Sequence, residues 1–229
     1  MPEDKTNKPQ CIGIIMDGNR RWAKKKGLTS FEGHTAGYKK LEEVVPWLKE
    51  EGVKTLIAYA FSTENWKRDE DEKNYLFKLL NVFLTKEKEK LKKNKIRVKF
   101  IGQIDRFSED IQKNIRALEE ETKDFSDFNL LLALSYGGRA EILSAVNKLI
   151  KKGDEVNEET FSKNLWSAGF PDPDLIIRTS GEQRTSGFLP WQAVYSELFF
   201  TKTYWPDFSK EEFNSILADF SSRERRIGK

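Results

Sequence analysis

The sequence predicts a single-domain α/β fold in which a largely parallel central sheet is flanked by helices. Segments of strand type alternate with segments of helical periodicity along the whole chain. The strand-type segments are continuous apolar runs, which is typical of parallel strands buried on both faces. Ligands of such sheets bind at the carboxyl ends of the strands. The segments that follow each strand are therefore the expected location of a functional site.

Short apolar runs bounded by turn residues mark the strands. The first run, CIGIIM, ends at the turn-forming sequence Asp17-Gly18-Asn19, and the second, VKTLIAYAF, ends at Ser62-Thr63-Glu64-Asn65. Residues 1–10 are polar and predict a flexible N-terminal tail, which precedes a domain spanning 11–229. The expected strands are 11–16, 53–61, 96–101, 129–134, 174–178 and 194–200.

Apolar residues spaced by three or four positions mark the helices. Tyr38, Leu41, Val45 and Leu48 share one face of a helix that Gly52 ends. The run KEKEKLKKNK alternates Glu with Lys, which favours a solvated helix face over a nucleic-acid-binding tract. The expected helices are 20–26, 34–51, 69–94, 108–123 (with Ser108 as N-cap), 139–152 and 209–223.

Composition excludes several kinds of chemistry. The chain has 229 residues, 40 Lys+Arg against 37 Asp+Glu, and a formal net charge of +3. It has no long apolar run and no apolar leader, so we expect a cytoplasmic protein without a membrane span. A single cysteine, Cys11, and a single histidine, His34, leave no internal disulfide and no Cys/His zinc site. Catalysis is therefore expected to depend on Asp, Glu, Asn and Arg, with an oxygen-bound metal such as Mg²⁺.

Two strand exits carry arginines beside small polar residues. After the first strand, Arg20 and Arg21 stand at a helix start whose free backbone N–H groups favour an anion. An ordinary turn with two solvated arginines is the alternative. After the fifth strand, Arg178 and Arg184 bracket hydroxyl residues, and arginine forks match phosphate oxygens. Two anion loops indicate two phosphorylated substrates or one polyphosphate, with Asp17 as a Mg²⁺ ligand, a proton-handling group or simply a turn residue.

Familiar nucleotide motifs are missing from the sequence. It contains neither G-x-x-x-x-G-K-[ST] nor G-x-G-x-x-G, so a P-loop NTPase or a dinucleotide enzyme is not expected. The near-neutral net charge argues against a nucleic-acid partner. A phosphate-binding α/β module for nucleotides or nucleic acid stays open as an alternative function.

A series of ordered motifs distinguishes these alternatives. They are Met16-Asp17-Gly18-Asn19-Arg20-Arg21-Trp22-Ala23-Lys24, Gly33-His34-x-x-Gly37, Tyr59-Ala60-Phe61-Ser62-Thr63-Glu64-Asn65-Trp66-x-Arg68, Tyr136-Gly137-Gly138-Arg139, Asp174–Gln192, Tyr195-x-Glu197-Leu198, Trp205-Pro206-Asp207-Phe208 and Arg223-x-Arg225-Arg226-x-Gly228. This set resembles the cis-prenyltransferase family, of the undecaprenyl diphosphate synthase type. The resemblance extends from about residue 11 to the C-terminus, and the ordered set is far more specific than any one motif.

The resemblance implies an enzyme that repeatedly condenses isopentenyl diphosphate onto an allylic diphosphate such as farnesyl diphosphate. Each step releases diphosphate, and the product is a long-chain polyprenyl diphosphate. The resemblance also implies a Mg²⁺ requirement, a homodimer, a hydrophobic tunnel, and transient peripheral association with the membrane through the lipid product. A non-catalytic subunit of a heteromer is the alternative. Retention of both arginine loops and of the C-terminal Arg-x-Gly favours the self-sufficient enzyme.

The resemblance further implies a role for each matching residue. Asp17 is the metal-associated carboxylate nearest the chemistry, and Glu197 is a second one. Ser62 and Asn65 lie near the reacting carbons and take part in proton removal. The substrate-binding residues are Gly18, Asn19, Arg20, Arg21, Trp22 and His34 for the allylic diphosphate, Arg178, Arg184 and Ser186 for isopentenyl diphosphate, Phe61, Trp66 and Arg68 beside them, and Arg226 and Gly228 reaching the partner's site.

Two features leave open questions for the structure. Ser30 stands where many relatives have an arginine, so one cation for the allylic diphosphate is missing, and Arg20 or a nearby lysine is the hypothetical substitute. The apolar residues of the helix over 69–94 could line the tunnel, but we interpret most of them as ordinary core. These residues are Leu76, Phe77, Leu79, Leu80, Val82, Phe83 and Leu84.

Overall fold

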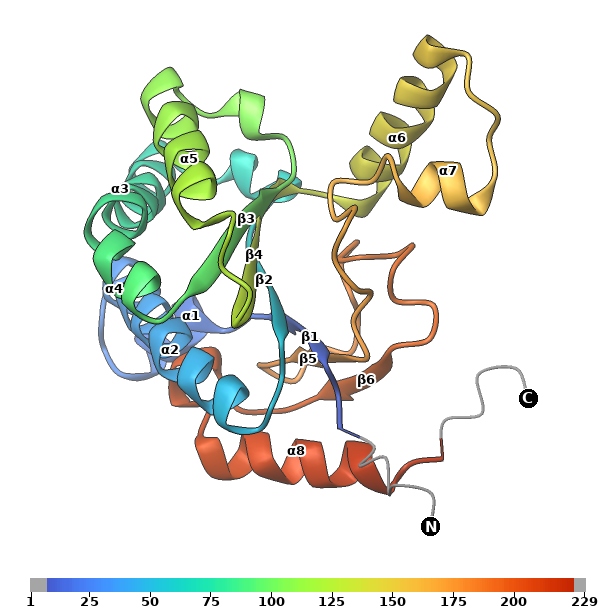
Figure 1. Ribbon diagram of the computed structural model, residues 1–229. Coiled ribbons are helices and arrows are strands. Elements are labelled where there is room, and N and C mark those ends of the chain that lie inside the picture. Colours follow the sequence, from blue (N-terminus) through green and yellow to red (C-terminus); the bar gives the residue numbers. More distant parts are fainter. Residues whose placement is uncertain (1–7, 225–229) are drawn as a thin grey trace.

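A six-stranded sheet forms the centre of the computed structural model, which describes residues 8–224 (Figure 1). Its strands are β1 (Cys11–Ile15), β2 (Thr55–Ser62), β3 (Ile96–Ile101), β4 (Phe128–Tyr136), β5 (Leu175–Arg178) and β6 (Glu197–Phe200). Every neighbouring pair is parallel, in the spatial order β3-β4-β2-β1-β5-β6. The predicted α/β fold with a parallel sheet is confirmed.

The strand order creates a switch point between β1 and β5. From β1 the chain continues to its neighbour β2 on one side, whereas from β5 it continues to β6 on the other. The register places Ile15 of β1 opposite Arg178 of β5. The segments that leave these two strands therefore start side by side, at the position where ligands bind in open parallel sheets.

Helices follow the strands in the predicted alternation. They are α1 (Asn19–Lys25), α2 (Ser30–Glu50), α3 (Glu70–Lys86), α4 (Lys88–Lys93), α5 (Glu109–Thr122), α6 (Gly138–Lys152), α7 (Glu158–Ser162) and α8 (Lys210–Ser222), with the 3₁₀ turns η1 (Thr63–Lys67), η2 (Ile104–Arg106) and η3 (Trp205–Asp207). α2 starts earlier than predicted because Thr29 and Glu32 form a capping box. The Thr29 hydroxyl accepts the Glu32 N–H at 3.2 Å, and the Glu32 carboxylate accepts the Thr29 N–H at 2.8 Å.

The prediction of a single helix over 69–94 is wrong, because the helix is interrupted at Glu87, between α3 and α4. The residues around the break are good helix formers, so local propensity does not explain it. The tertiary contacts of α4 do: Lys88 and Lys92 both pair with Glu121 of α5, and Leu91 is buried. Likewise β6 begins at Glu197 and not at residue 194.

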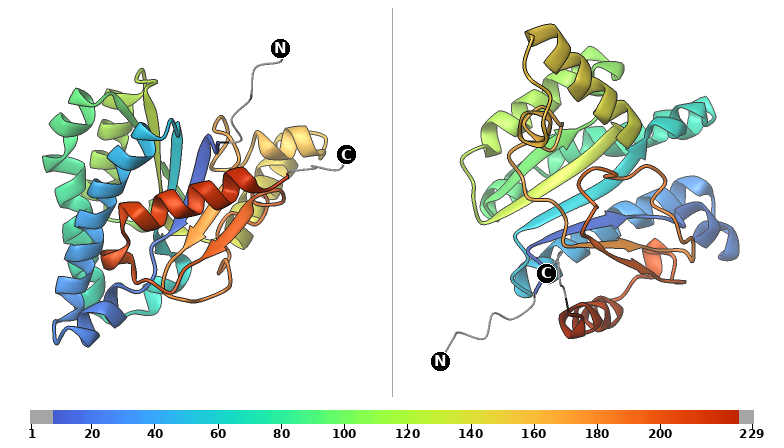
Figure 2. Two further views of the ribbon diagram at one scale, coloured as in Figure 1. Left: turned by 90° about the horizontal axis from the view of Figure 1, so that it is seen from below. Right: turned by 90° about the vertical axis from the view of Figure 1, so that its right-hand side faces the viewer.

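The two faces of the sheet are covered differently. Alternate strand residues such as Ile14 and Leu132 join one large core under α2, α3, α5 and α8. The opposite face, with Ile57 and Leu131, packs against Phe188 and neighbouring residues of the irregular segment after α7. Figures 1 and 2 show α6 and α7 projecting from one corner of the sheet. The expected helical cover is thus found on one face, and loop segments cover most of the other.

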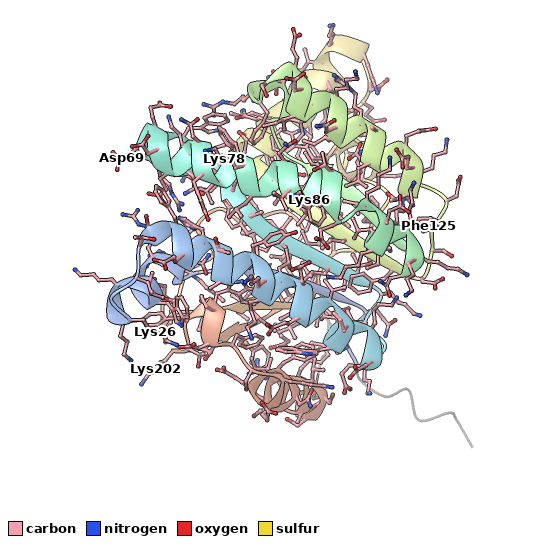
Figure 3. All side chains as sticks on the ribbon, turned by 90° about the vertical axis from the view of Figure 1, so that its left-hand side faces the viewer. Lys26, Asp69, Lys78, Lys86, Phe125 and Lys202 are labelled. Atoms are coloured by element: carbon pink, nitrogen blue, oxygen red, sulfur yellow. The ribbon has the colours of Figure 1, made fainter. Side chains whose placement is uncertain are left out.

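Figure 3 views the molecule from the side of the helical layer, and the two ends of the sheet lie on opposite sides of the picture. Lys26, Asp69 and Lys202 lie at one end, whereas Lys86 and Phe125 lie toward the other. Lys202 follows β6, so the first end is the carboxyl edge of the sheet. Over residues 8–224, the helices include none with the length and apolar character needed to span a bilayer.

Candidate active site

A cavity of about 1040 Å³ extends from the carboxyl edge of the sheet into the space beneath α2 and α3. Polar residues of the strand exits line one part of it, including Asp17, Asn65, Arg178 and Ser186. Apolar side chains line the rest: Leu41, Leu76, Phe77, Leu79, Leu80, Phe83, Phe107, Leu132 and Leu134. Five of the seven apolar α3 residues thus line the cavity, and four of them also belong to or pack against the main core: Leu76, Phe77, Leu80 and Phe83. Core packing and the proposed tunnel lining therefore coincide on this helix. A cavity that is polar at one end and apolar at the other suits an amphiphilic ligand.

A second cavity of about 580 Å³ adjoins the first, and we call it the basic cavity. Met16, Asp17, Asn19, His34 and Arg68 line both cavities. The basic cavity is also lined by Gly18, Arg20, Arg21, Lys24, Leu28 and Ser30. Its cations make it suitable for a phosphate group.

Two glycines allow the close approach of backbone segments that shapes the basic cavity. Gly18 has φ 106°, in the left-handed region, and a Cβ there would lie 2.7 Å from the ring of Tyr204. Gly37 of α2 faces the side chain of Asn19, where a Cβ would lie 2.5 Å from Oδ1. A larger residue at Gly18 would displace the Tyr204 ring, and one at Gly37 would displace the Asn19 side chain, which lines the cavity.

Asp17 and Arg178 form an ion pair at the switch point between β1 and β5. Arg178 Nη2 lies 2.8 Å from Asp17 Oδ2, and the Arg178 side chain is only 5% exposed. Thr179 fixes the Asp17 backbone, because its hydroxyl accepts the Asp17 N–H at 3.0 Å and donates to the Asp17 carbonyl at 2.7 Å. Asp17 is thus a positioned carboxylate with a buried cationic partner.

Arg178 also organises the loop that follows β5. Its Nη1 donates to Ser186 Oγ at 2.8 Å and to the Arg184 carbonyl at 2.5 Å. Its buried Nε–H has no partner within residues 8–224, so it is available to a ligand. Ser180 and Ser186 adopt left-handed backbones with φ 81° and 51°. Such conformations are costly for residues other than glycine and concentrate at functional sites.

Glu182 connects the loops that leave β1 and β5. Its Oε1 lies 2.9 Å from Arg21 Nη1, and its other oxygen pairs with Arg184. Arg21 Nη2 lies 3.1 Å from Asp17 Oδ1. The predicted anion loops are therefore neighbours in space, and carboxylates of the chain neutralise several of their arginines.

Ser62 ends β2, and Asn65 follows it in η1. The Ser62 N–H donates to Asn65 Oδ1 at 2.9 Å, and both residues line the larger cavity. Phe61, which precedes them, is 4% exposed and lines the same cavity.

Glu72 is a site residue that our sequence reasoning missed. It is 6% exposed, and its Oε1 lies 2.9 Å from both His34 Nε2 and Arg68 Nη1, while Oε2 lies 3.6 Å from Arg20. Burial alone would raise the pKa of Glu72, but the hydrogen bond from His34 and the charges of Arg68 and Arg20 lower it. Burial lowers the pKa of His34, so the neutral imidazole donates from Nε2 to an ionised carboxylate.

Not every predicted site residue faces a cavity. Trp22 donates its indole N–H to Asp207 at 2.7 Å, and Trp66 donates its own to the Ser135 hydroxyl at 2.8 Å. Both tryptophans thus connect elements that surround the site.

Glu197 lies opposite Leu175 at the amino end of β5, and its carboxylate is 2.6 Å from Arg223 Nη1. The structure does not bring Glu197 to Asp17 within one chain, and Arg226 and Gly228 lie outside the described residues.

Comparison with known proteins agrees with this geometry. A family model described as putative undecaprenyl diphosphate synthase matches residues 15–228. The chain belongs to this family. It is 50% identical over 223 residues to an isoprenyl transferase from Fusobacterium nucleatum, spanning 97% of this chain and 96% of that protein. A tritrans,polycis-undecaprenyl-diphosphate synthase (geranylgeranyl-diphosphate specific) from Thermoplasma volcanium is 44% identical, spanning 97% and 90%.

A solved relative has the same fold. The crystal structure of lavandulyl diphosphate synthase from Lavandula x intermedia, in complex with dimethylallyl diphosphate, superimposes with a TM-score of 0.92 at 32% identity and spans 97% of this chain and 99% of that one. The chain is therefore a prenyltransferase that condenses isopentenyl diphosphate onto an allylic diphosphate to make a polyprenyl diphosphate.

Proposed function

We propose that the chain is a self-sufficient, Mg²⁺-dependent, homodimeric enzyme that extends farnesyl diphosphate or a similar primer. The observation that carries the proposal is the Asp17–Arg178 pair, which lies where the basic cavity meets the apolar one. One end can hold two diphosphate groups, and the other can hold a hydrocarbon chain.

We assign the two substrates to neighbouring groups of cations. The allylic diphosphate lies in the basic cavity, at Gly18, Asn19, Arg20, Arg21, His34 and Arg68. Isopentenyl diphosphate lies at Arg178, Arg184 and Ser186. Held in register, the two substrates react without the entropic cost of a chance encounter.

The reaction breaks the allylic C–O bond, forms a carbon–carbon bond to isopentenyl diphosphate and releases one proton. Negative charge grows on the departing diphosphate, and the arginines of the basic cavity stabilise it. Ser62 and Asn65 line the larger cavity, which adjoins the basic one, and we assign them to the removal of the proton.

The donor set fits a magnesium ion shared between protein and substrate. Among residues 8–224 no group of three or more His, Cys, Asp or Glu side chains gathers in a form that could hold a metal. Mg²⁺ is commonly held by one or two carboxylates together with substrate phosphates and water, and Asp17 supplies one carboxylate between the two phosphate positions. Bound there, the ion would add positive charge beside the departing diphosphate. Glu197 lies at the amino end of β6, away from Asp17, so in this arrangement it is not a ligand of a metal ion held by Asp17 of the same chain.

The apolar part of the larger cavity suits the growing prenyl chain. Leu76, Leu80 and Phe83 of α3 face Leu132 and Leu134 of β4 across it. One relative is named as specific for geranylgeranyl diphosphate, and a solved relative is in complex with dimethylallyl diphosphate. The assay of activity therefore compares several allylic primers.

The edge of the sheet at β6 supports the homodimer. Val194, Tyr195, Leu198 and Phe200 are between 36% and 69% exposed along this edge and the segment before it. Exposed apolar groups on an edge strand favour pairing with a second chain. We expect a solution mass of twice 26.7 kDa by light scattering, and a monomer that is fully active alone would contradict the homodimer.

We also propose that the enzyme acts in the cytoplasm and contacts the membrane through its product. A polyprenyl diphosphate has a charged head and a long hydrocarbon tail, and burial of that tail in a bilayer is favourable. The protein itself would then need only transient contact with the lipid surface.

Purified protein should incorporate labelled isopentenyl diphosphate into a long polyprenyl diphosphate when an allylic primer and Mg²⁺ are present. The measurement is chromatography of the products made from dimethylallyl, geranyl, farnesyl and geranylgeranyl diphosphates. EDTA should abolish incorporation, and added Mg²⁺ should restore it. Failure of the single chain to turn over any primer would favour the heteromer subunit instead.

A further inference from the structure

Most cations of the basic cavity already have a carboxylate partner. Arg20 and Arg68 lie 3.6 Å and 2.9 Å from the oxygens of Glu72. Arg21 lies 3.1 Å from Asp17 and 2.9 Å from Glu182. When a phosphate binds, each of these arginines must give up its carboxylate partner or interact with both anions. The net electrostatic contribution of each arginine to phosphate binding is therefore limited.

Lys24 differs from these arginines. It lines the basic cavity, and in the part of the chain that the structure describes its ammonium group takes part in no ion pair or hydrogen bond. Lys24 follows Arg20 by four residues in α1, so the two side chains leave the same side of the helix. Ser30 and Leu28, which line the cavity as well, carry no charge.

We propose that Lys24 binds the diphosphate of the allylic substrate and is a major determinant of affinity for it. An unpaired ammonium gains a full charge interaction with a phosphate, because no carboxylate has to be displaced. Lysine is a common phosphate ligand that acts as a point charge on a flexible stem, so Lys24 can follow the head group as it moves during elongation. The inference deepens the proposed function and rests on it.

The position of Lys24 makes the proposal specific to one substrate. Arg178 and Ser186, which we assign to isopentenyl diphosphate, line only the larger cavity, and Arg184 lines neither. Lys24 lines only the basic cavity. Loss of the Lys24 charge should therefore affect the allylic diphosphate and spare isopentenyl diphosphate.

The chain offers a matched control for this test. Lys25 has the same charge, is exposed on the same helix and belongs to no ion pair of residues 8–224, but it lines neither cavity. Both lysines are exposed, so neither Lys24→Gln nor Lys25→Gln should impair folding. General effects of lowering the net charge will be common to both variants.

We expect Lys24→Gln to weaken binding of farnesyl diphosphate about tenfold relative to Lys25→Gln, which corresponds to about 1.4 kcal/mol. Titration calorimetry of the full chain with farnesyl diphosphate and Mg²⁺, without isopentenyl diphosphate, measures this directly. Steady-state kinetics should show the same rise in KM for farnesyl diphosphate, with KM for isopentenyl diphosphate unchanged. Lys24→Arg should restore most of the affinity.

Equal affinities for the Lys24→Gln and Lys25→Gln variants would overturn the inference, as would an equal rise in KM for both substrates. The proposed function is judged separately, by turnover of the unsubstituted chain. Binding that depends on Lys24 in a chain without turnover would support the role of Lys24 and contradict the proposed function. If the unsubstituted chain binds another allylic primer instead of farnesyl diphosphate, the same titrations with that primer decide the role of Lys24; if it binds none of the four primers, both proposals are wrong.

Discussion

Replacing Asp17 with asparagine is expected to lower kcat by roughly a thousandfold, or about 4 kcal/mol, while the fold persists. Asparagine has nearly the shape of aspartate and can still accept the hydrogen bond from Arg178, so the loop after β5 should stay in place. What it lacks is the negative charge that, in the proposed function, would hold Mg²⁺ beside the two diphosphates. Rates at saturating substrates and a range of Mg²⁺ concentrations measure the loss.

Two comparisons separate this role from a structural one. Asp17→Ala removes the partner of the buried Arg178 as well, so it should lower thermal stability more than Asp17→Asn does. Asp127→Asn makes the same substitution at an exposed position ahead of β4, and its activity should equal that of the unsubstituted chain. If Asp17→Asn retains full activity, Asp17 has no part in the chemistry.

The location of the site was predictable because parallel strands end at one edge. The strands β1 and β5 end at Ile15 and Arg178, and their continuous apolar runs predict parallel strands that are buried on both faces. Once the strands are placed, the polar residues after them must meet at that edge. Periodicity gives no strand order, however, so the contact between Asp17 and Arg178 needed either the structure or the family resemblance.

Other features depend on contacts that sequence patterns do not encode. Trp22 belongs to a conspicuous motif, but its hydrogen bond to Asp207 depends on how η3 packs against α1. Glu72 belongs to the run Asp69-Glu70-Asp71-Glu72, which is what a helix N-terminus commonly carries to satisfy its dipole. Only the packing of α3 against α2 shows that Glu72, unlike Glu70, turns inward to His34.

Glu72→Gln should lower kcat roughly a hundredfold without raising KM for the allylic diphosphate. Glu72 holds His34 and Arg68 in place and partly neutralises Arg20 and Arg68. The substitution loosens these groups, which costs rate, but it also removes a negative charge from the basic cavity, which favours binding of the diphosphate. Glu70→Gln is the matched control, because Glu70 is exposed and pairs with Lys73 alone among the ion pairs of residues 8–224.

The pH dependence of stability provides a second readout for the same network. His34 is the only histidine of the chain, and its folded-state pKa lies below the ordinary value of about 6.5. As the pH falls below that value the unfolded chain binds a proton that the folded chain does not, so the free energy of unfolding decreases. Glu72, whose pKa is also lowered, contributes stability that is lost as the pH falls below about 4.5.

In Glu72→Gln the two parts of this pH dependence should separate. The decrease below about pH 6.5 should persist, because Glu72 normally raises the pKa of His34 and its loss lowers that pKa further. The part below about pH 4.5 should become smaller, because the carboxyl group that titrates there is gone. Urea unfolding at a series of pH values measures both. If the variant loses as much stability below about pH 4.5 as the unsubstituted chain, Glu72 does not titrate as described. If its KM for the allylic diphosphate rises along with the fall in kcat, Glu72 does not act by positioning His34, Arg68 and Arg20.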